Sequence, residues 1–419
     1  MKIMVIGSGG REHALVWKIK KDNIDAKLFA VPGNGGIYDI AECIPVKTGH
    51  LEYIVDVAIK NNINLTVVGP EAPLAEGISD VFQQKGLKIF GPVRKAAELE
   101  ASKSFAKEFM KRHKIPTAGF EIVDNFEESI RILEKRTFPC VIKYDGLAAG
   151  KGVLVAKEFD EAKDFLEKIY RDKIFGKSDN KVVIEDCLTG REMSYLIFTD
   201  TVDFIPMVPA KDYKRIFDGD KGPNTGGMGC YSPPSIFNTE LENKIKNDIV
   251  IPTLKGLEKE GIDYRGVLYF GLMITSEGPY MLEYNVRFGD PETQVILPRL
   301  ESNIIEIMEA VTEQSLKKCR IRWSNMKSLC VILASSGYPG KYETEKEIKC
   351  LEKVKNMDVI LFHAGTKKEN GKIFTSGGRV LAITSTGNTF EEIRKKVYEA
   401  ADTIDFEGKY YRKDIGIEI

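Results

Sequence analysis

The sequence predicts an α/β protein that opens with a doubly wound parallel sheet. Short apolar strands alternate with helical segments from residue 2 to residue 91, a pattern typical of parallel sheets covered by helices. The strand-like runs are Lys2–Ile6, Ala26–Val31, Leu65–Val68 and Lys88–Gly91. The helical segments between them are Arg11–Lys20, Glu52–Lys60 and Gly77–Lys85. A chain of 419 residues that is 43% hydrophobic has room for roughly two to four such domains.

The rest of the chain mixes strands and helices, which predicts an α+β body followed by a small α/β tail. Between residues 118 and 189, helices at Phe126–Lys135 and Phe159–Tyr170 alternate with strands and glycine-rich loops. The next predicted elements are paired strands at Glu192–Thr199 and Val202–Met207, a helix at Lys244–Glu260, a hairpin of Gly266–Ile274 with Pro279–Asn285, and a helix at Ile304–Thr312. The tail elements are strands at Leu329–Ala334, Val359–Phe362 and Arg379–Thr384 and a helix at Phe390–Ala401.

The amino-acid composition argues against several classes of function. The formal net charge is -1 and no apolar run approaches the ~20 residues of a membrane span, so we expect neither nucleic acid nor membrane as a partner. The seven cysteines are scattered without a C-x-x-C pair and fit reduced thiols. The four histidines lie far apart, which disfavours a zinc site. Without a signal-peptide pattern at the start, we expect a cytoplasmic protein.

A glycine-rich turn, GSGGREH at residues 7–13, joins the first strand to the first helix. Glycines let the backbone approach a ligand, and a helix N-terminus offers free N–H groups, so the turn predicts a phosphate site. The dinucleotide fingerprint needs a third glycine where Glu12 stands, which disfavours NAD. The alternative is a tight turn without a ligand. The loops VPGNGG (31–36) and VVGPEAPL (67–74) border the same crevice.

A second glycine loop, KYDGLAAGKG at residues 143–152, lies between two predicted strands. It differs from a Walker A loop, which has one more residue before Gly-Lys, a following Ser or Thr, and then a helix. A loop of this kind with two lysines can fold over nucleotide phosphates, because backbone N–H groups and ammonium groups are both donors. The alternative is a surface hairpin loop with solvated lysines.

Three polar side chains follow one another on the face of the strand that ends in LEYNVRFGDPE (282–292). Alternate residues of a strand share a face, so Glu283 and Asn285 point one way, and Leu282 and Tyr284 the other. Two hard oxygen donors side by side suit Mg²⁺. Arg287 comes next on that face and could grip a carboxylate or phosphate. The alternative is a solvated strand face.

A fourth segment, GPNTGGMG at residues 222–229, follows the charged run KDYKR at 211–215. So many glycines outside a repeat indicate backbone packed close to a ligand or in special dihedrals. The alternative is a mobile surface loop.

Together these segments resemble the glycinamide ribonucleotide synthetases (phosphoribosylamine–glycine ligases) of the ATP-grasp superfamily. The matching segments run along essentially the whole chain: VIGSGGREHAL, PGNGG, VVGPEAPL, IKYDGLAAGKGV, GPNTGGMGCYSP, LEYNVRFGDPETQ, FHAGT and GGRVL. The resemblance implies a substrate-binding N-terminal domain (1–102), an ATP-grasp domain (103–325) with a mobile ATP lid (118–189), and a C-terminal domain (326–419). It implies ligation of glycine to 5-phosphoribosylamine through glycyl phosphate, giving glycinamide ribonucleotide, ADP and phosphate in purine biosynthesis.

The resemblance also implies roles for individual residues. Glu283 and Asn285 would hold Mg²⁺ (or Mn²⁺). ATP would contact Lys103, Lys143, Gly146, Gly150, Lys151, Gly152, Glu185, Asp186, Leu188 and Glu192. Phosphoribosylamine would lie beside Gly9, Gly10, Arg11, Glu12, Asn34 and Glu71. Glycine and the acyl phosphate would lie near Thr225, Gly226, Gly227 and Met228, with Lys143, Asp212, Lys214, Arg287 and Asp290 as the catalytic set.

The chain departs from the family pattern at a few positions, and other functions remain as alternatives. Tyr144, Tyr213 and the pair Asp186-Cys187 differ from the residues expected there, which affects the adenine pocket and position 213. The nearest rival is an ATP-grasp ligase that uses bicarbonate, and GGREHAL with NTGGMG favours the glycine enzyme. A non-catalytic nucleotide sensor and an NAD oxidoreductase are further alternatives. Among the partners we expect only the small-molecule substrates, with the chain as a monomer.

Overall fold

The first part of the computed structural model is the doubly wound parallel sheet that the sequence predicts. The structure describes residues 1–45, 50–148, 152–176 and 181–417. The strands are β1 (Lys2–Gly7), β2 (Lys27–Pro32), β3 (Glu42–Cys43), β4 (Leu65–Val68) and β5 (Ile89–Phe90), in the order β3-β2-β1-β4-β5. The helices are α1 (Gly10–Asp22), α2 (Leu51–Lys60), α3 (Glu71–Glu76), α4 (Ile78–Gln84) and α5 (Arg94–Ala101).

Alternate residues of β1 explain why helices cover both faces of this sheet. Met4 and Ile6 pack into a core with residues of α2 and α4, such as Ile54. Ile3 and Val5 point to the other face and share a second core with residues of α1. Because both faces are buried, the strand is apolar throughout, which is the pattern that the sequence displays.

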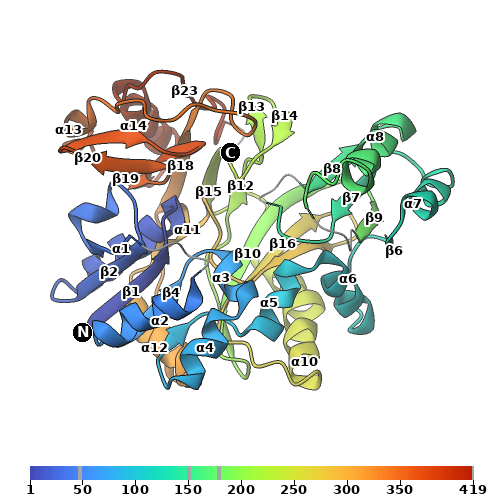
Figure 1. Ribbon diagram of the computed structural model, residues 1–419, viewed down its shortest axis with the longest axis horizontal. Coiled ribbons are helices and arrows are strands. Elements are labelled where there is room, and N and C mark those ends of the chain that lie inside the picture. The colour runs from blue at the N-terminus through green and yellow to red at the C-terminus, as the bar shows by residue number, and fades with distance from the viewer. Residues whose placement is uncertain (46–49, 149–151, 177–180, 418–419) are drawn as a thin grey trace.

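A separate lobe carries four antiparallel strands and two helices and extends to one side of the molecule (Figure 1). Its strands are β6 (Phe120–Val123), β7 (Cys140–Tyr144), β8 (Val153–Ala156) and β9 (Val182–Asp186), in the order β6-β9-β7-β8. Its helices are α7 (Phe126–Leu133) and α8 (Phe159–Tyr170). The lobe has its own hydrophobic core, in which Ile142 and Leu166 are fully buried.

The central body is a four-stranded antiparallel sheet, in the order β11-β10-β16-β17. Its strands are β10 (Arg191–Thr199), β11 (Phe204–Pro206), β16 (Gly266–Ile274) and β17 (Pro279–Asn285). The helices of this part are α6 (Lys103–Arg112), α9 (Thr239–Ile245), a π-helical stretch (Lys246–Val250), α10 (Ile251–Lys259), α11 (Thr293–Ile296) and α12 (Ile304–Thr312). The helix that we expected from Lys244 begins at Thr239, because the Asn238 side chain accepts a hydrogen bond from Leu241 N (2.8 Å) and caps it.

The C-terminal sheet contains strands from two distant parts of the chain. Its order is β12-β15-β18-β22-β19, with β23 paired to β18. The strands are β12 (Lys211–Asp212), β15 (Gly229–Ser232), β18 (Lys327–Ser335), β19 (Ile360–His363), β22 (Arg379–Gly387) and β23 (Lys409–Tyr410). Hairpins β13–β14 (Arg215–Phe217, Lys221–Asn224) and β20–β21 (Thr366–Glu369, Lys372–Thr375) and helices α13 (Leu351–Val354) and α14 (Phe390–Thr403) complete this part. β12 and β15 thus join the C-terminal sheet, although they lie within residues 103–325, which we expected to form the ATP-grasp domain.

Within the described residues, no helix has the length and apolar character that a bilayer crossing requires.

Two buried histidines join the N-terminal domain to the C-terminal sheet. His13 of α1 accepts a hydrogen bond at Nδ1 from the backbone N–H of His363 in β19 (2.8 Å). Asn34 donates from Nδ2 to the carbonyl oxygen of the same His363 (2.8 Å). Burial lowers the pKa of His13 to about 3, helped by the neighbouring His363, and burial lowers the pKa of His363 to about 4. Both rings are therefore neutral in the folded protein at neutral pH.

This contact predicts a loss of stability in acid. The folded-state pKa of His13 is depressed, so its contribution is complete above pH 6.5 and falls as the pH drops toward 4. For His13 alone the loss reaches about 3 kcal/mol at pH 4, since each pH unit below 6.5 removes about 1.4 kcal/mol until the folded-state pKa is approached. Thermal unfolding of wild type and His13→Asn, which keeps an acceptor that cannot be protonated, should give a flatter pH dependence for the variant. Parallel curves of melting temperature against pH for the two proteins would contradict the assignment of this pH dependence to His13.

Candidate active site

The edge strand β17 presents the residues on which the predicted metal site depends. Its Glu283 pairs with Gly271 of β16, and its Asn285 pairs with Tyr269. Tyr284 points to the opposite side, where its hydroxyl lies 2.9 Å from Thr253 Oγ1 in the core. Glu283 and Asn285 are therefore on one face of the strand, as the alternation predicts.

Glu283 lies among cations. Its Oε1 is 3.8 Å from Lys214 Nζ. Burial raises the pKa of Glu283, but Lys214, Lys143, Lys103 and Arg287 together hold it below its usual value. An ionised carboxylate beside an amide oxygen is a hard donor pair of the kind that Mg²⁺ or Mn²⁺ accepts, with the remaining positions left to phosphate and water. The residues present therefore fit a divalent cation bound together with a nucleotide.

Arg287 is held by acidic residues of the N-terminal domain. Its Nη2 pairs with Glu100 Oε1 at 2.8 Å, and its Nε lies 3.4 Å from Glu71 Oε2. The same Nη2 donates to Asn285 Oδ1 at 2.9 Å. Glu100 also accepts from the backbone N–H of Val286 at 2.7 Å. Arg287 thus connects a predicted metal ligand to Glu71, which the sequence placed on the phosphoribosylamine side.

Sequence reasoning missed Glu100, because one glutamate in the charged helix α5 carries no distinguishing pattern. Burial raises the pKa of Glu100 to about 7 despite the opposing charge of Arg287. The pKa of Glu71 instead falls to about 2, because Arg287 and Arg11 outweigh its burial. The two carboxylates that hold Arg287 therefore have different affinities for a proton.

The predicted ATP residues Lys143 and Glu185 form a buried ion pair. Glu185 of β9 forms ion pairs with Lys143 of β7 and with Lys107 of α6, a residue that the sequence analysis did not single out. Lys143 also donates to the carbonyl oxygen of Leu282 (3.0 Å), and Lys103 donates to that of Gly146 (2.8 Å). These contacts link the separate lobe to the central body and to α6.

Three of the other predicted nucleotide residues, Gly152, Asp186 and Leu188, lie within the described part of the separate lobe and the segment that follows it. Gly152 accepts a backbone hydrogen bond from Tyr144 N (2.7 Å) at the base of the glycine loop. Gly150 and Lys151 fall outside the described residues. Asp186 points outward from β9 and pairs with Arg136, whereas Leu188 is half-buried in the segment that follows this strand.

A narrow pocket lies between the central sheet and the strand that carries Asp212. Its lining includes Glu192, Ser194, Asp212, Lys214, Tyr269 and Leu282. Lys214 Nζ lies 3.4 Å from Glu192 Oε2, so one ammonium group connects Glu192, a predicted ATP contact, to the predicted metal ligand Glu283. Glu192 raises the pKa of Lys214 well above its usual value.

Asp212 stands out in this pocket. Its Oδ1 is buried and has no hydrogen-bond partner among the residues that the structure describes. Burial raises the pKa of Asp212 well above its usual value, and the nearby Glu292 adds to the effect against Lys214 and Arg379. A Cβ at Gly227, which has φ +113°, would lie 2.6 Å from this oxygen, so glycine is required there.

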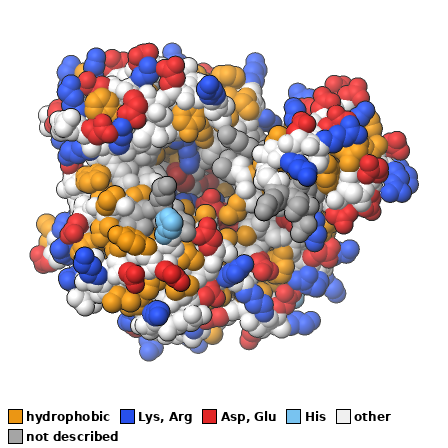
Figure 2. Space-filling view, in the orientation of Figure 1, with side chains coloured by type: hydrophobic (Ala, Val, Ile, Leu, Met, Phe, Trp, Pro, Cys, Tyr) orange, Lys and Arg blue, Asp and Glu red, His pale blue; other side chains and the backbone are white. Residues whose placement is uncertain are grey.

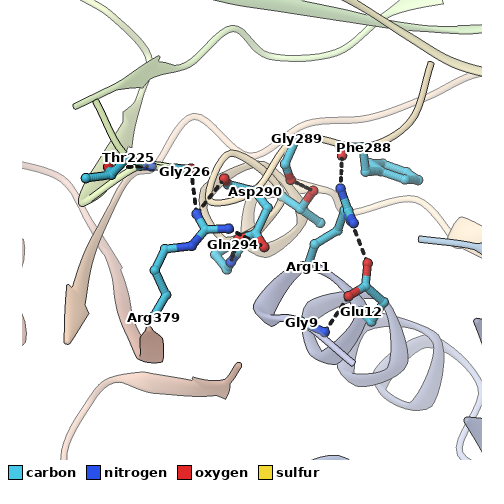
Figure 3. Close-up of polar contacts among 12 residues, drawn as sticks. Gly9, Arg11, Glu12, Thr225, Gly226, Phe288, Gly289, Asp290, Gln294 and Arg379 are labelled. Carbon is cyan, nitrogen blue, oxygen red and sulfur yellow. Dashed lines mark hydrogen bonds and ion pairs between the residues drawn. The ribbon is translucent and has the colours of Figure 1, made fainter. Parts of the chain in front are cut away.

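At the N-terminal crevice, Glu12 fills the place of the missing third glycine. Its carboxylate accepts from Gly9 N (2.5 Å) and from Arg11 Nε (2.5 Å), as Figure 3 shows. Any Cβ at Gly7 or Gly69 would overlap the Glu12 side chain. The Glu12 carboxylate therefore takes up the Gly9 N–H at the start of α1, a donor that a dinucleotide pyrophosphate would otherwise use.

Several predicted substrate residues are occupied by internal contacts. Asn34 Oδ1 accepts from the N–H groups of Gly36 (3.0 Å) and Ile37 (3.1 Å), which shapes the loop after β2. Thr225 Oγ1 donates to the Lys214 carbonyl oxygen (2.8 Å) and supports the glycine segment. Met228 is fully buried beside Ile216 and Ala334, and its backbone N–H donates to the Tyr213 carbonyl oxygen (2.8 Å). Gly10 lies against Gln294, whose Nε2 would be 2.6 Å from an added Cβ.

Figure 2 shows a hollow between the C-terminal part and the N-terminal part of the molecule, with basic and acidic atoms at its bottom. Models of the phosphoribosylglycinamide synthetase N domain, ATP-grasp (A) domain and C domain match residues 1–100, 101–293 and 328–418. The chain belongs to the phosphoribosylglycinamide synthetase family. The resemblance seen in the sequence motifs is thereby confirmed, and so is the expected α/β fold with an ATP-grasp body.

Relatives in this family match the whole chain. The phosphoribosylamine–glycine ligase of Caldanaerobacter subterraneus subsp. tengcongensis is 46% identical, and that of Clostridium acetobutylicum is 47% identical; each match covers 99% of this chain and 99% of the relative. The crystal structure of phosphoribosylamine–glycine ligase from Thermotoga maritima aligns with a TM-score of 0.86 at 36% identity, over 99% of this chain and 100% of that one.

More distant neighbours share the fold alone. The biotin carboxylase domain of Hydrogenobacter thermophilus 2-oxoglutarate carboxylase aligns with a TM-score of 0.74 at 18% identity, over 98% of this chain and 91% of that one. That structure is a complex with MgADP, ADP and bicarbonate. Family membership and this likeness agree on an ATP-grasp body.

Proposed function

We propose that this phosphoribosylglycinamide synthetase joins glycine to 5-phosphoribosylamine by way of glycyl phosphate, with ATP converted to ADP and phosphate. The product is glycinamide ribonucleotide, an intermediate of purine biosynthesis. The observation that carries the proposal is the shared face of Glu283 and Asn285, continued by Arg287, opposite Lys103 and Lys143. Family models over all three parts of the chain, and relatives named phosphoribosylamine–glycine ligase, support the choice of substrates.

Activation of the carboxylate is the first requirement, because a carboxylate has no good leaving group. A glycine carboxylate oxygen attacks the γ-phosphorus of ATP, the bond to the bridging oxygen breaks, and ADP leaves. Lys143 and Arg287 neutralise the charge that spreads over the transferring phosphoryl group. Glu283 and Asn285 hold a divalent cation, Mg²⁺ or Mn²⁺, which when bound neutralises further charge on the phosphate oxygens.

The amide bond forms in the second step. The neutral amine of phosphoribosylamine attacks the carbonyl carbon of glycyl phosphate, phosphate is expelled, and the nitrogen loses a proton. The N-terminal crevice with Gly9, Gly10, Arg11 and Glu71 binds the sugar phosphate, whereas Asp212, Lys214 and Asp290 lie around glycine. Catalysis is positioning and charge neutralisation, without a covalent enzyme intermediate.

The domain roles follow from this division. We assign residues 1–102 to the phosphoribosylamine side, 103–325 to ATP-grasp catalysis and 326–419 to the C-terminal domain. The segment 118–189 acts as a lid that keeps water from glycyl phosphate, a role that its separate core supports. The enzyme acts as a cytoplasmic monomer.

The decisive experiment is ADP release with Mg-ATP, glycine and phosphoribosylamine formed in situ, with each component omitted in turn. ADP release should require both glycine and the amine, and mass spectrometry should find glycinamide ribonucleotide. Replacing glycine by alanine or bicarbonate separates this function from that of a bicarbonate-using ligase. Release with bicarbonate but not with glycine would contradict the proposal.

Arg11 offers a test of the crevice assignment. It donates from Nη1 to the Phe288 carbonyl oxygen (3.1 Å) and lowers the pKa of Glu71, so it is coupled to the phosphoribosylamine side and lies away from the ATP lysines. Arg11→Ala should raise the KM for phosphoribosylamine roughly tenfold or more and leave the ATP KM unchanged. Arg94→Ala, on the exposed start of α5, is the matched control. A raised ATP KM with an unchanged amine KM would reverse the assignment.

A further inference from the structure

Arg379, at the start of β22, brings the C-terminal sheet into contact with two active-site segments. Its Nη1 donates to the carbonyl oxygens of Gly226 (2.6 Å) and Asp290 (2.8 Å). Its Nη2 pairs with Asp290 Oδ2 at 2.9 Å. Figure 3 shows this guanidinium group between the glycine segment and the turn that carries Asp290. One side chain thus joins segments that are far apart in the sequence.

The contact fixes the Asp290 side chain in a defined direction. Gln294 donates from Nε2 to the other carboxylate oxygen, Asp290 Oδ1 (2.7 Å), so both oxygens have partners. Asp290 Oδ2 also faces the first glycine loop, since a Cβ at Gly9 would lie 3.4 Å from it. The Arg379–Asp290 pair therefore lies where the glycine segment, the Asp290 turn and the N-terminal crevice meet.

Burial strengthens the electrostatic interaction between Arg379 and Asp290. Arg379 is 19% exposed and Asp290 is 14% exposed, which weakens the screening of their charges by water. Burial raises the pKa of Asp290, but Arg379 and Arg11 outweigh it, and the carboxyl group has a pKa below its usual value. The planar guanidinium group reaches three oxygens at once, which a lysine ammonium group on a flexible stem does not reproduce.

We propose that Arg379 is a positioning residue for the ligation: it holds the Gly226 backbone and the Asp290 carboxylate together, so that Asp290 faces Gly9 at the junction of the glycine and amine sites. The inference rests on the proposed function. It means that a residue of the C-terminal domain helps to position active-site groups of the other domains.

The test compares Arg379→Met and Arg379→Lys in the full chain. Arg379→Met should lower kcat about 100-fold, because a small misplacement at a reacting centre has effects of this size. Its ATP KM should stay unchanged, since Lys103 and Lys143 lie on other elements. Arg379→Lys should recover part of the turnover, because an ammonium group still pairs with Asp290. Arg299→Lys is the control: this arginine is also buried and bonds to Ser232 Oγ (2.6 Å), but not to Asp290.

A double-mutant cycle with Asp290→Asn identifies the partner through which Arg379 acts. If Arg379 positions Asp290, Arg379→Met should add little to the loss of turnover in the Asp290→Asn background. Independent losses that multiply, or a folded Arg379→Met enzyme with normal kcat, would overturn the proposal. If Arg379→Met does not fold, Arg379→Lys replaces it in the same double-mutant cycle. Its kcat should then be below that of wild type, and it should add little to the loss of turnover in the Asp290→Asn background. A wild-type chain that releases no ADP with these substrates would instead contradict the proposed function.

Discussion

Glu283→Gln should lower kcat by roughly 1000-fold and leave the fold intact. The substitution preserves shape but removes the negative charge from the pair that faces Lys214, Lys143 and Lys103. A neutral amide binds a hard divalent cation much more weakly than a carboxylate does. Steady-state turnover at saturating Mg-ATP measures the loss, and electron paramagnetic resonance of Mn²⁺ with the nucleotide measures metal binding apart from activity.

A matched control for this variant lies on the same hairpin. Glu277→Gln changes an exposed glutamate in the turn between β16 and β17, where the Glu277 carboxylate accepts a hydrogen bond from the Tyr280 hydroxyl (2.8 Å). We expect normal turnover from it. Near-normal turnover and Mn²⁺ binding in Glu283→Gln would show that the cation is held elsewhere.

Arg287→Lys should lower kcat by about 100-fold or more, although the charge is conserved. Arg287 reaches Glu100 and Asn285 through Nη2 and Glu71 through Nε, and one ammonium group does not span all three. We expect the loss in kcat, with a smaller effect on the KM for ATP, because the predicted ATP phosphate contacts come from Lys103 and Lys143.

Arg112→Lys provides the comparison for this substitution. Arg112 forms a surface ion pair with Glu260 at 3.0 Å, away from the active site, and surface pairs contribute only about 0 to 1 kcal/mol. Its turnover and thermal midpoint should equal those of wild type. If Arg287→Lys behaves in the same way, Arg287 takes no part in charge neutralisation during phosphoryl transfer.

Local sequence patterns were sufficient to predict a site wherever all of its residues lie on one short segment. The alternation on β17 predicted that Glu283 and Asn285 share a face, and the glutamate in GSGGREH argued against a dinucleotide. The same reasoning failed for β12 and β15, which are short strands beside glycines with little apolar alternation. β15 forms because β18 of the C-terminal sheet pairs with it, and β12 in turn pairs with β15.

Residues whose interaction partners lie on distant helices or strands could not be predicted from local sequence patterns. Glu100, Lys107 and Arg379 lie in ordinary charged or motif segments, and their partners are far away in the chain. A single sequence shows a residue's neighbours along the chain but not its neighbours in space. Met228 shows the reverse case, since its motif predicted a substrate contact while the fold buries its side chain in a core.

By itself, the sequence determined the alternation of strands and helices, the order of the domains and the hard-donor pair of β17, because these depend on periodicity and residue type over a few positions. Only the tertiary structure decided that Arg287 is held by Glu100 and Glu71, that Glu185 pairs with two lysines, and that Arg379 reaches Asp290. The physical reason is that a buried charge must be compensated by whichever partner the packing of distant segments brings to it.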